Sequence, residues 1–158
     1  MRDRGFTLLE LILVLVVIGL TVVIAYPSLV RGRTAFQLRT VARDVIGVLR
    51  FARESAVTEQ KVMLAVIDSR AQVITVADDV GGGARSYTLP ADVKVQGLAG
   101  AGEAVPEDVP MTIRFLPNGS AEDAQILLRS GTGTTLRIVV DAITGGAQVR
   151  TEPGGMRP

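Results

Sequence analysis

The sequence predicts an α+β protein in which one long N-terminal α-helix packs on an antiparallel β-sheet or sandwich body. Three observations support this fold class. A predominantly apolar run covers residues 6–25, apolar residues then recur with helical spacing through residues 28–60, and short β-rich segments separated by turn residues follow up to residue 151. Because the helical period gives way to a strand period only after Glu59, the helix and the strands occupy separate parts of the chain.

Composition limits the chemistry open to the chain. Its 158 residues correspond to one domain, and 47% hydrophobic with 21% charged residues provide enough apolar material for a core. The chain contains no His and no Cys. Histidine general bases, cysteine nucleophiles, disulfides and thiolate zinc sites are therefore excluded.

Charge is unevenly distributed along the chain, although the net charge is only +1. Residues 28–61 carry a net charge of +4, whereas residues 62–158 hold eight basic and eleven acidic side chains, a net charge of −3. The chain thus has a basic stem and a mildly acidic body, and these surfaces could attract each other between neighbouring copies. No global attraction to nucleic acid is expected.

Residues 6–25 have the length and composition of a membrane-spanning helix. Sixteen of these twenty residues are apolar, and Glu10 is the only charged one. As a helix the run spans about 30 Å, the thickness of a bilayer core. A cleaved secretory signal is the alternative, but its apolar region usually covers about 7–15 residues and contains no carboxylate. Counting the basic residues on each side of the run would place the C-terminal part in the cytoplasm.

Glu10 requires an explanation, because a charge within a membrane helix costs about 2.5–3.5 kcal/mol at the centre and less near an end. A carboxylate in the first turn complements the helix dipole, which stabilises it by about 0.3–1 kcal/mol. If the chain were cut before Phe6, the new α-amine would lie four residues before Glu10, on the same helix face. Amine and carboxylate could then pair within one chain or between adjacent chains.

The residues Arg4-Gly5-Phe6-Thr7-Leu8-Leu9-Glu10, followed by the apolar run, resemble the type IV prepilin signal. The resemblance implies that prepilin peptidase cuts between Gly5 and Phe6 and N-methylates the Phe6 amine. It also implies that Glu10 guides subunit docking, and that the protein crosses the bacterial inner membrane once, with its N-terminus cytoplasmic and its body periplasmic. We prefer this orientation to the one from the charge count, because the motif matches at seven positions.

The resemblance divides the N-terminal part into a leader peptide, residues 1–5, and a transmembrane and assembly helix, residues 6–27. Gly19 and Pro27 are candidate helix-disruption sites, because glycine lowers helix propensity and proline removes a backbone donor. A simple kink at the membrane edge is the alternative to a functional melt.

Residues 28–60 are predicted to continue the helix with one apolar stripe: Leu38, Val41, Ala42, Val45, Val48, Leu49, Ala52 and Ala56. The arginines off that stripe are predicted to form a solvated basic face: Arg39, Arg43, Arg50 and Arg53.

Residues 61–158 are predicted to form a β-rich body. A hairpin turn is expected at residues 68–71 and further turns at residues 117–119 and 142–146. Residues 97–110, rich in Gly, Ala and Pro, are predicted to form a long surface loop. The predicted strands are residues 62–67, 72–77, 86–89, 93–97, 111–115, 126–129, 136–141 and 147–151.

The C-terminal half carries a second resemblance. The pieces IRFLPNGS (residues 113–120), ILL (126–128) and RIVVD (137–141), with the following Thr144-Gly145, are similar to the minor pseudopilin H family of type II secretion. This resemblance implies a pilin-like fold and a structural subunit of the periplasmic pseudopilus, with no cofactor. The implied partners are prepilin peptidase, other major and minor pseudopilins and the inner-membrane assembly platform.

Two other hypotheses stay open: a minor type IV pilin that primes pili or binds DNA, and a membrane-anchored periplasmic enzyme or receptor. DNA binding would require a basic patch on the body, but the body's net charge is negative. Candidates for such a patch are Arg85, Arg114, Arg129, Arg137, Arg150 and Arg157.

Little in the chain indicates an enzyme or a metal site. Gly119-Ser120 lacks the G-x-S-x-G elbow, and no histidine exists to activate the serine. Gly81-Gly82-Gly83 is not followed by the Gly-Lys-Ser/Thr pattern of a phosphate loop. Some acidic residues could chelate Ca²⁺, but their spacing fits no ligand loop and solvated acidic loops are predicted instead: Asp78, Asp79, Glu103, Glu107 and Asp108.

Overall fold

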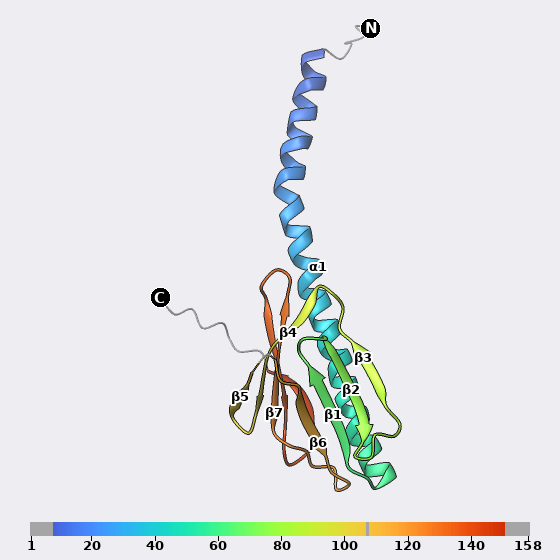
Figure 1. Cartoon of the computed structure of the whole chain (residues 1–158). Coiled ribbons are helices and arrows are strands. Elements are labelled where there is room, and N and C mark those ends of the chain that lie inside the picture. The colour runs from blue at the N-terminus through green and yellow to red at the C-terminus, as the bar shows by residue number, and fades with distance from the viewer. Residues whose placement is uncertain (1–7, 107, 151–158) are drawn as a thin grey trace.

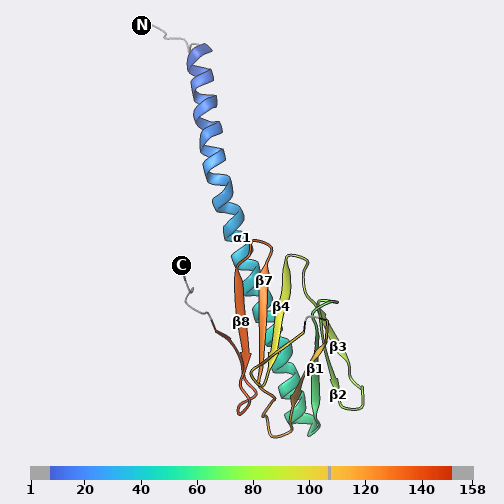
Figure 2. The same ribbon diagram turned by 60° about the vertical axis from the view of Figure 1, so that its left-hand side comes forward.

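One long helix carries a β-rich body around its C-terminal half (Figure 1). The computed structural model describes residues 8–106 and 108–150, and the side chains of these residues apart from 23–35. Helix α1, Leu8–Glu59, is 52 residues long, which confirms a single helix ending near residue 60. Figures 1 and 2 show its first half extending away from the body and its second half lying against the strands.

The second half of α1 is amphipathic, as its apolar spacing predicted. Residues of the predicted stripe are fully buried except Val48, which is partly buried against the same core. The helix ends where Gln60 adopts a left-handed conformation with φ of 54°. There the Lys61 N–H donates to the Ala56 carbonyl at 3.3 Å, which satisfies one of the carbonyls left open at a helix C-terminus.

Four strands form the first antiparallel sheet, in the order β3-β2-β1-β6. The turn between the first two strands is closed by Asp68. Its Oδ1 accepts the backbone N–H groups of Arg70 and Ala71, both at 2.8 Å. This is the predicted hairpin. The strands of this sheet confirm their predicted positions and are β1 (Met63–Asp68), β2 (Val73–Asp78), β3 (Arg85–Thr88) and β6 (Met111–Phe115).

Five strands form the second antiparallel sheet, in the order β5-β4-β7-β8-β9. The chain leaves the first sheet after β3, returns to it for β6, and leaves it again for β7, so neither sheet is continuous in sequence. The strands are β4 (Val93–Gly100), β5 (Glu103–Val105), β7 (Ala124–Ser130), β8 (Thr135–Val140) and β9 (Ala147–Arg150).

The prediction of a long surface loop over residues 97–110 is wrong. Strand β4 continues to Gly100 and turns back through Ala101 and Gly102, both with positive φ, into β5. Small residues weaken a strand locally, but here the backbone hydrogen bonds to β7 and the burial of Leu98 hold them in the ladder. Composition alone could not show this, because the stabilising partner lies far away in sequence.

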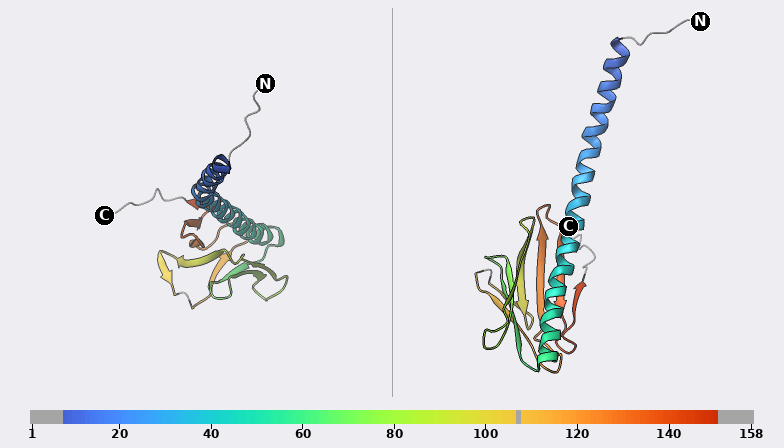
Figure 3. Two further views of the ribbon diagram at one scale, coloured as in Figure 1. Left: turned by 90° about the horizontal axis from the view of Figure 1, so that it is seen from above. Right: turned by 90° about the vertical axis from the view of Figure 1, so that its right-hand side faces the viewer.

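The core lies between α1 and the two sheets. Figure 3 shows, from above, the helix along one side, the red-brown and yellow strands of the second sheet, and the green strands of the first sheet splayed away from them. Alternate strand residues point into this space, as in β6, where Met111, Ile113 and Phe115 are buried and the residues between them are exposed. Phe115 is the largest fully buried side chain.

Candidate assembly site

The first half of α1 exposes apolar side chains on every side. All large hydrophobic residues described between Leu8 and Val22 have exposed fractions from 43% to 77%. In the second half of the same helix, Leu49 is 0% exposed. Soluble proteins rarely expose contiguous apolar patches of this extent, and such patches mark surfaces that contact a membrane or another protein.

Glu10 lies in the first turn of α1 and is exposed. It is the only acidic residue of that turn, and apolar residues surround it in sequence. A carboxylate at this position complements the positive end of the helix dipole. Gly5 and Phe6, the predicted cleavage residues, lie outside the described residues.

Gly19 and Pro27 both lie within α1, which is one helix across the two positions. A Cβ added at Gly19 would meet nothing within 4 Å. Nearby, the Thr21 hydroxyl donates to the Val17 carbonyl at 2.8 Å, so this polar group is satisfied inside the apolar stretch. The disruption of the helix at Gly19 and Pro27 during assembly stays a prediction.

Among the helices of the described part of the chain, none meets the length and apolarity required to cross a membrane.

Arg53 joins the second half of α1 to two turns of the body. Its Nε donates to the Gly119 carbonyl at 3.1 Å, and a Cβ on Gly145 would collide with both Gly119 and the Arg53 side chain. The prediction that Arg53 belongs to a solvated face is therefore wrong, whereas Arg39, Arg43 and Arg50 are exposed. Only the fold reveals this contact, because Arg53 and Gly119 are 66 positions apart in the sequence.

A groove of about 480 Å³ separates α1 from the edge strand β3. The Arg85 guanidinium lies 4.5 Å from the centre of the Phe51 ring, and the Tyr87 hydroxyl donates to Asp44 Oδ2 at 3.2 Å. Burial, together with the negative charge of Asp44 and this hydrogen bond, raises the pKa of Tyr87 from 10.0 to about 12. These contacts fasten β3 to the helix.

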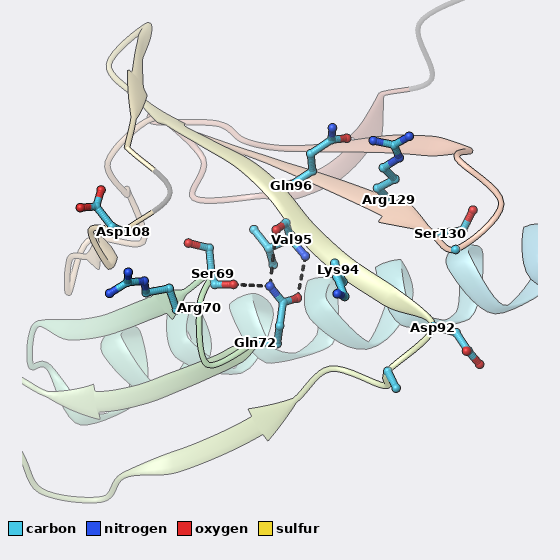
Figure 4. Close-up of a pocket in the computed structure, with 12 residues that line it drawn as sticks. Ser69, Arg70, Gln72, Asp92, Lys94, Val95, Gln96, Asp108, Arg129 and Ser130 are labelled. Atoms are coloured by element: carbon cyan, nitrogen blue, oxygen red, sulfur yellow. Dashed lines mark hydrogen bonds between the residues drawn. The ribbon is translucent and has the colours of Figure 1, made fainter.

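A hollow of about 860 Å³ lies where the two sheets separate (Figure 4). Gln72, in the β1–β2 turn, bridges them: its Oε1 accepts the Val95 N–H at 2.7 Å and its Nε2 donates to the Val95 carbonyl at 3.5 Å. The amide thereby replaces the strand that β4 lacks on this edge, because β5 pairs only with residues from Leu98 to Gly100.

Among the described residues, the acidic side chains considered as calcium ligands form no common metal site. Asp78 closes the β2–β3 turn, because its Oδ1 accepts the Val80 N–H at 3.2 Å. Its Oδ2 lies 3.9 Å from the Lys61 Nζ. Within the described residues, no three His, Cys, Asp or Glu side chains are placed to hold a metal ion. Glu107 lies outside the described residues.

The predicted basic candidates are only partly brought together. Arg129, Arg137 and Arg150 lie on β7, β8 and β9 of the second sheet. Arg85 and Arg114 lie on the first sheet, and Arg157 falls outside the described residues.

A helix with an exposed apolar half and a second half buried on antiparallel strands defines the class of pilin-like subunits. Residues 1–26 match the prokaryotic N-terminal methylation motif, and residues 41–153 match the family described as type II transport protein GspH. The chain belongs to this GspH family and is a minor pseudopilin of type II secretion. Both resemblances predicted from the sequence are confirmed, and the alternative of a minor type IV pilin is not better supported.

Two solved structures of the minor pseudopilin EpsH from the type II secretion system of Vibrio cholerae have a similar fold. One has a TM-score of 0.55 at 12% identity and covers 72% of this chain and 96% of that one. The other has a TM-score of 0.57 at 13% identity and covers 72% of this chain and 92% of that one. No curated protein sequence matches the chain.

Proposed function

We propose that prepilin peptidase cuts this minor pseudopilin between Gly5 and Phe6 and methylates the Phe6 amine. The mature chain then assembles through residues 6–27 into the periplasmic pseudopilus. The observation that carries this proposal is the exposed apolar half of α1 with Glu10 in its first turn. Its own body does not bury this surface, so the membrane and the helices of other subunits must do so.

In this proposal the chain has four functional parts: the leader 1–5, the assembly helix 6–27, the amphipathic continuation 28–60 and the periplasmic body 61–158. The leader is cytoplasmic and the helix crosses the inner membrane once. The partners are the peptidase, the other pseudopilins and the inner-membrane assembly platform. The role is structural and needs no cofactor.

Glu10 sets the axial stagger between neighbouring subunits. Between packed apolar helices an ionised carboxylate is costly to bury. Pairing with the Phe6 amine of an adjacent subunit offsets that cost at one relative height only. Local unwinding between Gly19 and Pro27, where helix propensity is lowest, lets the helix adjust its length during assembly.

Intact-mass analysis of the protein extracted from membranes tests the processing step. The expected mass begins at Phe6 with one added methyl group. Gly5→Val should accumulate as precursor, because a branched side chain would not fit a cleft that accepts glycine, whereas the control Gly19→Val should still be cut. Retention of Met1, or a cut near Ala25, would overturn the proposal.

A further inference from the structure

The outer face of the five-stranded sheet carries basic side chains. Lys94 lies directly opposite Arg129 across β4 and β7, and Arg137 lies directly opposite Arg150 across β8 and β9. We call these four residues the basic sheet face. The register places only uncharged residues at the other strand positions described on this face: Gly97, Ala99, Ala104, Gln125, Leu127, Thr135, Val139 and Gln148.

Like charges directly opposite each other on antiparallel strands are destabilising. Lys94, Arg129 and Arg150 are exposed and Arg137 is half-buried. Among the described residues, carboxylates lie at the edges of the face: Asp92 and Asp108 line the same hollow as Lys94 and Arg129, and Asp141, in the β8–β9 turn, interacts electrostatically with Arg150. Figure 4 shows Lys94 on β4 and Arg129 on the neighbouring β7, with Asp108 on the opposite side of the hollow.

The four cations form a short diagonal track. They cross four adjacent strands and advance by one two-residue step, so they span about 15 Å. Strands β4, β7 and β8 lie side by side in this region (Figure 2). The half-buried side chain of Leu127 lies opposite Arg137 and one two-residue step from Arg129, whereas Val139 lies one step beyond Arg137, opposite Gln148.

The composition of the face favours a protein partner over a nucleic acid. Arginine beside an apolar side chain such as Leu127 is typical of protein interfaces. No aromatic side chain lies at these strand positions to stack on a base. Four cations could neutralise at most about four phosphates.

We propose that the basic sheet face docks on the carboxylate-bearing body of a neighbouring pseudopilus subunit. This inference rests on the proposed function, because packing of the α1 helices is what brings two bodies side by side. Charge complementarity identifies the occupant: the body of this chain is itself acidic, so a neighbour of the same kind presents carboxylates. The contact joins two different surfaces, which suits an open helical filament rather than a closed pair.

Site-specific cross-linking in cells that produce the whole secretion system tests the inference. The chain has no cysteine, so Thr135→Cys introduces a unique thiol between Arg129 and Arg137 on the face. A short thiol-to-carboxylate reagent should join it to an Asp or Glu of another pseudopilin, identified by mass spectrometry. A second variant of the protein carries Leu13→Cys instead of Thr135→Cys. In this variant an ordinary thiol cross-linker reports the packing of the assembly helices.

Reversing two charges, Lys94→Glu with Arg129→Glu, should lower the yield at Thr135→Cys about tenfold and leave the Leu13→Cys yield unchanged. The matched control, Arg50→Glu with Arg114→Glu, makes the same charge change at exposed positions elsewhere and should change the yield less than twofold.

Three results would overturn the inference, and they differ in what they say about the proposed function. The docking face alone would be refuted if the helix cross-link at Leu13→Cys formed but the cross-link at Thr135→Cys did not. It would also be refuted if the Thr135→Cys yield did not change on charge reversal. Loss of both cross-links in the unreversed chains would refute the proposed function as well. Binding of the full-length chain to duplex DNA that the reversal abolishes would assign the face to nucleic acid instead.

Discussion

The two halves of α1 differ in what covers their apolar side chains. Between Leu38 and Ala56 the apolar residues form one stripe, and this stripe is buried on the chain's own strands. Between Leu8 and Val22 nearly every residue is apolar, and all of them are exposed. A striped helix needs one apolar neighbour, whereas a helix that is apolar all round needs an apolar environment on every side. The first half therefore depends on other molecules.

Equivalent truncations in the two halves test this difference most strongly. Leu49→Ala should lower the free energy of unfolding of the body by about 2–5 kcal/mol, because it leaves a cavity in a closed core. Leu13→Ala should change it by less than about 0.5 kcal/mol. Denaturant unfolding of the full-length chain in detergent, followed by circular dichroism, measures both. Equal losses would contradict the division of the helix.

Arg53 tests how the second half of α1 is attached to the body. Arg53→Ala should lower the free energy of unfolding by about 1.5–3 kcal/mol, the range for a hydrogen bond that involves a charged group. Arg50→Ala, at an exposed position one turn away, should cost less than about 0.5 kcal/mol. If both substitutions have the same effect in the unfolding assay, the contact with Gly119 contributes nothing.

The smallest expected effect is a pH dependence at Tyr87, where β3 meets the helix. Its pKa is raised to about 12 in the folded protein, so the folded state holds the phenolic proton more tightly than the unfolded state. The associated stability is fully present below pH 10 and is lost as the pH rises from 10 towards 12. Tyr87→Phe should make the unfolding free energy less dependent on pH in that window. An identical pH profile in the variant would exclude the effect.

Most of the fold could be predicted, because its signals are local in sequence. The apolar stripe from Leu38 to Ala56 predicted the buried helix face, and β-rich runs separated by turn residues predicted β1, β2 and β6. The segment 97–110 was misjudged, since Gly97 and Gly100 lie in a strand only through pairing with β7. Arg53 was misjudged for the same reason, because its partner Gly119 is distant in sequence.

Only part of the candidate site could be predicted from the sequence. The cleavage residues and Glu10 could be proposed from seven adjacent positions. Three residues of the basic sheet face, Arg129, Arg137 and Arg150, were candidates for a basic patch from the sequence. Their grouping with Lys94 could not be predicted, because the four residues come from four strands and meet only through register. In the sequence, the negative net charge of residues 62–158 conceals a local excess of positive charge.

The central claim is that the exposed half of α1 is an assembly surface whose register is set by Glu10. Cross-linking between Leu13→Cys and a matching cysteine on a neighbouring pseudopilin, combined with a secretion assay, tests it. Glu10→Leu and Glu10→Gln keep the Gly5-Phe6 pair, so both chains should be inserted and cut.

Both Glu10 variants should lose cross-linked complex about tenfold, with Glu10→Leu at least as impaired as Glu10→Gln, and secretion should fall with it. Thr21→Val, which removes a polar group already satisfied within its own helix, should behave like the unaltered chain. Unchanged levels of cross-linked complex and secretion in Glu10→Leu would contradict the account.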